Sequence, residues 1–421
     1  MFELLQQVRV LDPVSGTDRI ADVLIADGAI ATVQSKISDF PDNTLVRACQ
    51  GTILGPGLVD LYSHTGEPGF EERETLESLM QAAAAGGFTR LALLPDTMPP
   101  VDNPAGVARL LQLKQTNSPS PPHLYFWGAL TLDVAGQQMT ELADLARAGV
   151  VGFADGKPVE NLGLLRRLLE YLQPMDKPIA LWACDRQLAG NGVMREGASS
   201  IRFGLPGTPA LAETAALAAL LEVVAATGTP VHLMRVSTAR GVELIQDAKA
   251  RGLPVTASTT WMHLLLDSEA VGSYDPNLRL SPPLGNPEDK AALIRGVRDG
   301  VLDAIAIDHS PYTYEEKTVA FGSAPNGAIG LELALPLLWH HLVETGVLSA
   351  LQLWRLLSTR PAECLRQTPA AIAPAEPAEL ILFAPQQPWQ VEGHTLKSRS
   401  ANTPWLGQQL TGRVVQIWIS F

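Results

Sequence analysis

Several side chains that could do chemistry stand at the ends of short apolar runs in the middle of this sequence. They are Tyr62, His64, Asp155, Trp182, Arg235, Asp308 and His309. An imidazole and two carboxylates that converge could bind a metal ion or move a proton. Solvated aspartates and a hydrogen-bonded histidine are the commoner explanation of so few residues. The pattern alone is therefore a weak indication of a metal site.

The apolar runs predict the elements that would position these side chains. Eight runs alternate with helical patterns, and they span residues 57–62, 90–95, 124–129, 150–154, 179–183, 230–235, 254–258 and 303–307. One predicted helix, TLESLMQAAAAGG, should stop at Gly86-Gly87. Eight alternations favour a (β/α)8 TIM barrel over an open doubly wound sheet, and the active sites of such barrels lie at the carboxyl ends of the strands.

The two ends of the chain differ from its middle. Residues 1–54 and 366–421 contain short β-like runs, with Asp27-Gly28 as a hairpin signal. We expect both ends to form a small β-sandwich domain beside a barrel of residues 55–365. The predicted fold class is therefore α/β, with three segments along the chain.

Composition narrows the class of protein. The chain has 421 residues, of which 46% are hydrophobic and 18% charged, so it can bury a large core. A formal charge of −13 without a basic run argues against nucleic acid or an anionic membrane as a partner. Three separated cysteines predict no disulfide framework. The start MFELLQQVRVLDP lacks the pattern of a signal peptide, so the expected location is the cytoplasm.

Longer motifs resemble a known family over nearly the whole chain. GLVDLYSHTGEPGFEERETLESLMQAAAAGGFTRLALLPDTMPPVD, GVVGFADGKPVEN, YDPNLRLSPPLGNPEDKAALIRGVRDGVLDAIAIDHSPYTYEEK and SRSANTPWLGQQLTGRV resemble dihydroorotases of the amidohydrolase superfamily. The resemblance implies hydrolytic opening or closing of a cyclic amide in pyrimidine biosynthesis. It also implies a binuclear zinc centre held by a His-x-His pair, a bridging Asp and two further His, with a catalytic Asp after the last strand.

When the family's metal site is matched to this sequence position by position, several of its residues are missing. The positions that keep the family's residues are His64, Asp155 and the catalytic Asp308, whereas Tyr62, Trp182 and Arg235 stand where the resemblance implies histidines. Indole and guanidinium groups have no lone pair to offer zinc, and a phenol near pKa 10 is a poor ligand. The family's substrate clamp matches Gly66, Asp96 and either Met262 or Tyr312, so we predict no substrate-binding residue.

Other histidines are not expected to replace the missing ligands. His232 is three residues from Arg235 on a strand and should face the opposite side. We interpret His263 as structural and His309 as a hydrogen-bonding neighbour of the site. Arg235 is instead expected to form an ion-pair network with Asp155, Asp308 or both, because these carboxylates would otherwise face each other without a cation. Trp182 should fill the remaining volume.

The favoured hypothesis is a catalytically inactive dihydroorotase-like protein with no cofactor. The resemblance supplies a partner, because inactive chains of this kind associate with the catalytic chain of aspartate carbamoyltransferase. A homo-oligomer is also expected, and the helix-like segment 331–346, with His340 and His341, is a candidate apolar surface unless it packs on the barrel. Two alternatives remain: an active dihydroorotase, or a divergent cyclic amidohydrolase with one zinc held by His64, Asp155 and Asp308.

Overall fold

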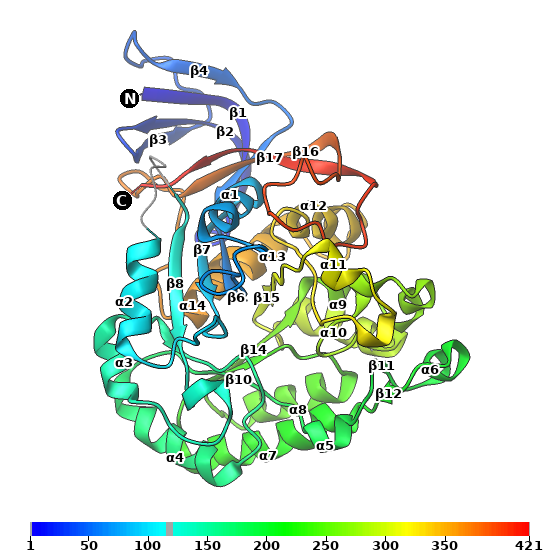
Figure 1. The fold of residues 1–421 in the computed structure, drawn as a ribbon. Coiled ribbons are helices and arrows are strands. Elements are labelled where there is room, and N and C mark those ends of the chain that lie inside the picture. Colours follow the sequence, from blue (N-terminus) through cyan, green and yellow to red (C-terminus); the bar gives the residue numbers. More distant parts are fainter. Residues whose placement is uncertain (1, 115–120, 421) are drawn as a thin grey trace.

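The computed structural model describes residues 2–114 and 121–420. Each of the eight predicted runs overlaps a strand; four strands lie within their runs and are shorter than predicted, and the other four are displaced by one or two residues. These strands are β6 (Leu58–Ser63), β7 (Phe88–Leu93), β8 (His123–Gly128), β9 (Gly152–Phe153), β10 (Ala180–Trp182), β13 (Val231–Met234), β14 (Val255–Thr260) and β15 (Ala304–Ala306). They pair in parallel as two four-stranded sheets, β6-β7-β8-β9 and β10-β13-β14-β15 (Figure 1).

The two sheets meet at both seams through main-chain contacts. A parallel bridge joins Phe153 to Ile179 at one seam. At the other seam, the Asp308 amide donates to the Tyr62 carbonyl at 3.1 Å, and the His64 amide donates to the His309 carbonyl at 2.8 Å. The carboxyl ends of β6 and β15 therefore lie next to each other, as the predicted barrel requires.

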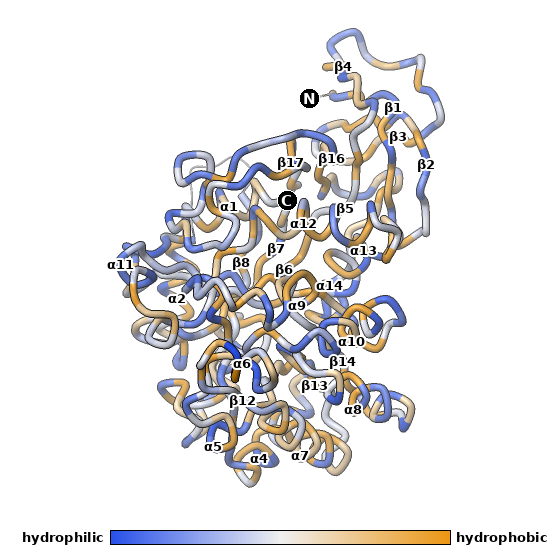
Figure 2. The backbone as a smooth tube through the Cα atoms, turned by 90° about the vertical axis from the view of Figure 1, so that its right-hand side faces the viewer, coloured by the Kyte–Doolittle hydropathy of each residue, from blue (hydrophilic) through white to orange (hydrophobic). Residues whose placement is uncertain are grey.

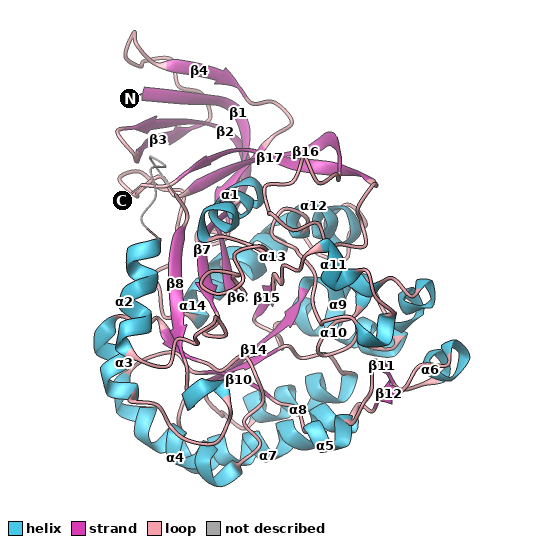
Figure 3. Ribbon diagram, in the orientation of Figure 1, coloured by secondary structure: helices cyan, strands magenta, loops and turns pink. Residues whose placement is uncertain are grey.

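Helices alternate with these strands and cover them (Figure 3). They are α1 (Leu76–Gly86), α2 (Pro104–Leu113), α3 (Leu142–Ala148), α4 (Leu162–Leu172), α5 (Arg186–Ala189), α6 (Ala198–Phe203), α7 (Leu211–Thr227), α8 (Ala239–Ala250), α9 (Trp261–Leu265), α10 (Pro287–Arg298), α11 (Tyr314–Lys317), α12 (Ala334–Leu338), α13 (Ala350–Trp354) and α14 (Arg360–Cys364). Helix α1 illustrates the local signals: the Thr75 side chain accepts from the Ser78 amide, and Gly87 at φ 87° ends the helix as predicted.

Both chain ends contribute to one seven-stranded sheet at the top of Figure 1. Its strands are β1 (Phe2–Asp12), β2 (Thr17–Ala26), β3 (Ala29–Gln34), β4 (Leu45–Ala48), β5 (Ile53–Pro56), β16 (Leu380–Gln390) and β17 (Gln409–Trp418). This sheet has its own cluster of buried apolar side chains, including Val8 and Leu380. A shared terminal sheet is confirmed, whereas its description as a sandwich and the boundaries at residues 54 and 365 stay predictions.

The segment 331–346 is helical but is not the exposed apolar surface considered above. It contains α12 and a wider helical turn at Trp339–Val343, and the apolar side chains of both are mostly buried. His340 is exposed and pairs with Glu344 at 2.8 Å. The alternative reading, in which this helix packs on the rest of the molecule, is therefore the correct one.

The length and hydropathy of a helix decide whether it could cross a membrane. Within residues 2–114 and 121–420, no helix is both long and apolar enough to cross a membrane.

Candidate functional site

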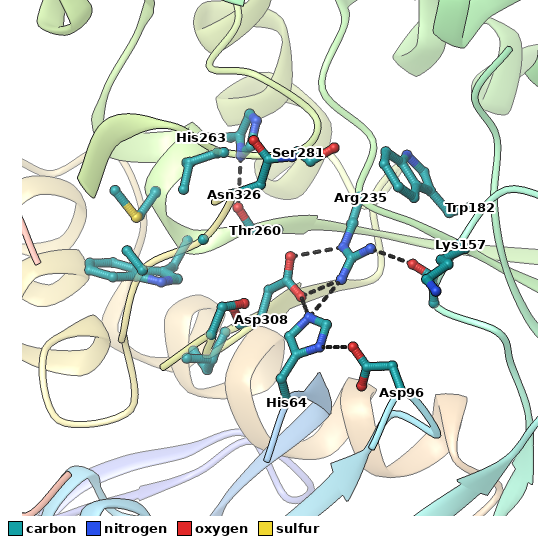
Figure 4. A pocket seen from close by; sticks show the side chains of 18 residues that line it. His64, Asp96, Lys157, Trp182, Arg235, Thr260, His263, Ser281, Asp308 and Asn326 are labelled. Carbon is teal, nitrogen blue, oxygen red and sulfur yellow. Dashed lines mark hydrogen bonds and ion pairs between the residues drawn. The ribbon is translucent and has the colours of Figure 1, made fainter. Parts of the chain in front are cut away.

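The centre of the site is an ion pair between the ends of two barrel strands. Arg235 follows β13, and its Nε and Nη2 atoms donate to the two carboxylate oxygens of Asp308 at 2.8 and 2.6 Å (Figure 4). Nη1 donates to the Gly156 carbonyl at 2.7 Å. The side chains are only 5% and 15% exposed. A bidentate, charge-assisted pair of this kind is among the stronger polar contacts in proteins, and it confirms the predicted network with Asp308.

Tyr62 holds the backbone on both sides of this pair. Its hydroxyl accepts from the Arg235 amide at 3.1 Å, and its carbonyl accepts from the Asp308 amide at 3.1 Å. Arg235 and Asp308 both have left-handed φ angles, 55° and 53°, which cost other residues than glycine about 1–3 kcal/mol each. Burial raises the pKa of the Tyr62 phenol, so the side chain stays neutral. Tyr62 therefore positions the pair.

His64 and Asp96 extend the pair into a row of alternating charges. His64 Nδ1 lies 2.6 Å from Asp96 Oδ2, and His64 Nε2 lies 3.4 Å from Asp308 Oδ1. Burial alone would lower the pKa of His64, but the Asp96 and Asp308 carboxylates raise it to about 9. Burial would likewise raise the pKa of Asp308, but Arg235 and His64 hold it well below its usual range. With His64 protonated, the order of charges is Asp96⁻, His64⁺, Asp308⁻, Arg235⁺, and His64 Nε2 also lies 3.2 Å from Arg235 Nη2.

Asp155 is turned away from this row. Its carboxylate accepts hydrogen bonds from the Leu130 and Thr131 amides at 2.7 and 3.1 Å and from the Thr131 hydroxyl at 2.6 Å. The expectation that Asp155 faces Asp308 across the opening is therefore wrong, because these three nearby donors satisfy its carboxylate. The structure brings His64 and Asp308 together but leaves Asp155 apart. Across residues 2–114 and 121–420, no group of three or more His, Cys, Asp or Glu side chains is placed to hold a metal ion.

A cavity of about 240 Å³ opens beside the charged row (Figure 4). Trp182 forms part of its wall, and the Arg235 guanidinium carbon lies 5.1 Å from the centre of the indole ring. An arginine over an aromatic face at this distance is a favourable cation–π contact. Trp182 thus packs against the arginine, but it fills the predicted volume only in part, because the cavity remains beside it.

Comparison with known proteins agrees with the motifs. Residues 51–240 match the protein family described as Dihydro-orotase-like. A "Probable dihydroorotase-like protein" of Synechocystis sp. is 45% identical, over 97% of this chain and 98% of that protein. The chain belongs to the dihydroorotase-like family. A dihydroorotase of Syntrophus aciditrophicus is 39% identical, over 98% of this chain and 96% of that protein.

Solved structures agree on the fold. An L-hydantoinase (dihydropyrimidinase) from Arthrobacter aurescens superimposes with a TM-score of 0.85 over 100% of this chain and 97% of that chain. The identity is 21%, so this likeness concerns the fold alone. The barrel and the terminal sheet together are therefore an architecture already seen in hydantoinases.

Two other histidines near this site, His263 and His309, form hydrogen bonds with neighbouring groups of the chain. His263 Nδ1 lies 2.7 Å from the Thr260 hydroxyl, and burial lowers the pKa of His263 to about 4, so its ring stays neutral. His309 Nε2 lies 3.3 Å from the buried Glu74, while its Nδ1 accepts from the Gly330 amide. The interpretation of His263 as structural stays a prediction, because His263 also lines the cavity. His309 forms hydrogen bonds as expected, but its side chain bonds to Glu74 and Gly330 and not to the Arg235–Asp308 pair.

The expectation that His232 and Arg235 face opposite sides of their strand is wrong. Its Nε2 lies 2.8 Å from the Ser258 hydroxyl, which itself lies 2.9 Å from the Tyr62 hydroxyl. His232 therefore belongs to the same buried network as Tyr62 and Arg235. The alternation of a strand predicts opposite sides for residues 232 and 235, but the left-handed φ of Arg235 breaks that alternation.

Asp96 is the site residue that sequence reasoning placed in the wrong role. It was expected only as a replacement in the family's substrate clamp, yet it is the partner of His64. The signal was present, because Asp96 follows β7, and the neighbouring strand β6 ends one residue before His64. Neighbouring parallel strands present their carboxyl ends side by side.

Proposed function

We propose that this chain is a catalytically inactive member of the dihydroorotase-like family, acting in pyrimidine biosynthesis as a structural partner of the aspartate carbamoyltransferase catalytic chain. The observation that supports inactivity most strongly is the bidentate bond between Arg235 and Asp308. Asp308 matches the position that the resemblance assigns to proton transfer. A carboxylate held by arginine and histidine well below its usual pKa is a poor base.

The residues present do not fit the binuclear zinc centre that the family implies. Arg235 places a permanent positive charge and five N–H donors at one ligand position. The Tyr62 hydroxyl is already bonded to Ser258 and to the Arg235 amide. Both ring nitrogens of His64 already have partners, since Nδ1 lies 2.6 Å from Asp96 Oδ2 and Nε2 lies 3.2 Å from Arg235 Nη2. We therefore assign no step to a metal in this chain.

The first test is metal content and turnover. Protein purified without chelator or a His tag should carry zinc far below one equivalent per chain by elemental analysis. It should also show no conversion between dihydroorotate and carbamoyl aspartate. The matched control is Asp308→Ala, which should give the same background rate as the wild type. Two tightly held metals, or a rate that Asp308→Ala abolishes, would favour the active alternative, which the names of the relatives and the retained His64 and Asp308 also support.

The second test concerns the partner. The chain should be co-expressed with the carbamoyltransferase catalytic chain of the same genome and analysed by size exclusion with light scattering. An obligate interface of more than about 2,000 Å² should give co-elution in a fixed ratio. Transferase activity should then rise or resist heat better than the activity of the catalytic chain expressed alone. Two independent peaks at micromolar concentration, with transferase activity unchanged, would contradict the partnership.

A further inference from the structure

A second cavity lies where the barrel meets the terminal sheet, away from the Arg235–Asp308 pair. Its volume is about 690 Å³, which is within the range of ligand-binding pockets. Its walls are the end of α10, the helices α13 and α14, which Figure 2 shows close to α10, and the turn between β1 and β2. Asp303 lines it and precedes β15, whereas Asp308 follows that strand, so the cavity lies at the opposite end of the barrel from the site. We name it the α13–α14 cavity, and the lining residues used below are Pro13, Val14, Arg298, Arg355, Thr359 and Arg360.

The helix that forms one wall of this cavity contains an irregular turn. Residues 350–364 run through α13, a π turn at Arg355–Thr359 and α14. In the π turn, the Arg360 amide donates to the carbonyl of Arg355, five residues back. Such turns are rare inside α-helices and are frequently found at functional sites. Both Arg355 and Thr359 line the cavity, so this turn presents polar side chains to it.

Thr359 has a buried hydroxyl without a partner. The residue is only 6% exposed, and among the described residues no group forms a hydrogen bond with its Oγ1 atom. In an α-helix a threonine hydroxyl can donate to the carbonyl four residues back, but here that carbonyl, of Arg355, already accepts from the Arg360 amide. A buried polar group without a partner is costly and calls for an explanation. Rotation about the Cα–Cβ bond would exchange the methyl and hydroxyl groups and turn the hydroxyl toward a ligand in the cavity.

Arg355 is a cation of this cavity that no carboxylate compensates. Its Nη2 atom donates to the Pro13 carbonyl at 3.2 Å. Within residues 2–114 and 121–420, it forms no ion pair, and its Nε and Nη1 groups have no acceptor. The carboxylates that line the cavity leave Arg355 unmatched because each of them is paired with another cation. These pairs are Arg298–Asp299 at 2.9 Å, Arg360–Glu363 at 2.6 Å and Lys249–Asp303 at 2.6 Å.

Free guanidinium N–H groups beside a hydroxyl are donors suited to phosphate. An arginine fork binds two oxygens of a carboxylate or a phosphate in one plane. A carboxylate has no third oxygen, whereas a phosphate has oxygens outside that plane that could accept from the Thr359 hydroxyl. Arg298 adds a second guanidinium from α10, on another wall of the cavity. The volume leaves room for an organic group beside Pro13 and Val14.

We propose that the α13–α14 cavity binds a phosphate-bearing molecule whose phosphate accepts hydrogen bonds from Arg355 and Thr359. The bound molecule would connect the π turn to the turn between β1 and β2, because Arg355 also donates to the Pro13 carbonyl. It would therefore hold the terminal sheet against the barrel. The inference goes beyond the proposed function and does not rest on it, since this cavity shares no lining residue with the cavity beside Arg235.

Isothermal titration calorimetry of the full chain in phosphate-free buffer tests the proposal. The probes are inorganic phosphate, ribose 5-phosphate and adenosine 5′-monophosphate, with succinate as a dianionic carboxylate. At least one phosphate probe should bind with a dissociation constant below about 1 mM, and succinate should bind at least about 10-fold more weakly. If a sugar or nucleoside phosphate binds more tightly than inorganic phosphate, the ligand is an organic phosphate. Equal affinities would identify it as the free ion.

Two variants and a control assign the binding to this cavity. Arg355→Ala should weaken it about 10- to 100-fold, the effect of losing a charge-assisted hydrogen bond, and Thr359→Val about 2- to 10-fold. Without ligand, Thr359→Val should melt no lower than the wild type, because the hydroxyl that it removes has no partner. The matched control is Arg166→Ala on α4, which removes an exposed arginine that pairs with Glu170 and should leave the affinity unchanged.

Three results would overturn the proposal. The first is a wild type that binds none of the phosphate probes at millimolar concentration. The second is binding that persists unchanged in both Arg355→Ala and Thr359→Val, which would place the phosphate elsewhere on the chain. The third is succinate that binds as tightly as the phosphate probes. None of these results involves zinc or turnover, so a failure here is distinguishable from a failure of the proposed function.

Discussion

Replacing Arg235 with alanine is expected to lower the free energy of unfolding by about 3–5 kcal/mol. The substitution leaves the Asp308 carboxylate largely buried without its bidentate partner, and the remaining ion pair is the longer one with His64 at 3.4 Å. It also removes the donor to the Gly156 carbonyl and the cation that packs on Trp182. Denaturation in urea, monitored by circular dichroism, measures the change.

Two controls separate this effect from the loss of any arginine. Arg240 forms an exposed ion pair with Glu243 on α8, and Arg240→Ala should change the free energy of unfolding by less than about 1 kcal/mol. In the background of Asp308→Asn, the cost of Arg235→Ala should fall clearly, because the buried negative charge is already gone. A cost below about 1 kcal/mol for Arg235→Ala in the wild type would show that the ion pair contributes little to stability.

The strands of the barrel were predictable because their signals are local. Short apolar runs bounded by turn and helix signals mark each strand, and all eight runs overlap one in the structure. The lengths were less predictable: β9, for example, is only Gly152–Phe153. The end of helix α1 was predictable because Gly87 readily adopts the left-handed conformation that ends a helix.

The charged pair was predictable from charge alone, whereas the direction of each carboxylate was not. A buried arginine close to retained aspartates is expected to form an ion pair with one of them, and the structure shows the pair Arg235–Asp308. The Asp155 carboxylate instead accepts hydrogen bonds from the Leu130 and Thr131 amides. The sequence alone does not show that these amides lie next to it. His232 was misplaced because strand alternation cannot anticipate a left-handed residue at position 235.

The stabilising contribution of His64 is expected to disappear as the pH rises from about 6.5 to about 9. The folded state raises the pKa of His64 from 6.5 to about 9, so the folded protein holds this proton more tightly than the unfolded chain. A pKa raised in the folded state stabilises fully below the unfolded value and is lost as the pH passes the folded value. The rise in the pKa of His64 from 6.5 to about 9 corresponds to a contribution on the order of 3 kcal/mol to the free energy of unfolding.

The measurement compares the wild type with His64→Gln at pH 6 and pH 9.5 by urea denaturation. The difference in their free energies of unfolding should be largest at pH 6 and should shrink on the alkaline side. The comparison with a variant is necessary because Lys317 titrates in the opposite sense. Burial lowers the pKa of Lys317 to about 8, so this group adds stability above that pH in both proteins. A wild-type advantage that is equal at both pH values would mean that the folded state does not raise the pKa of His64, and the alternating row of charges would then be wrong.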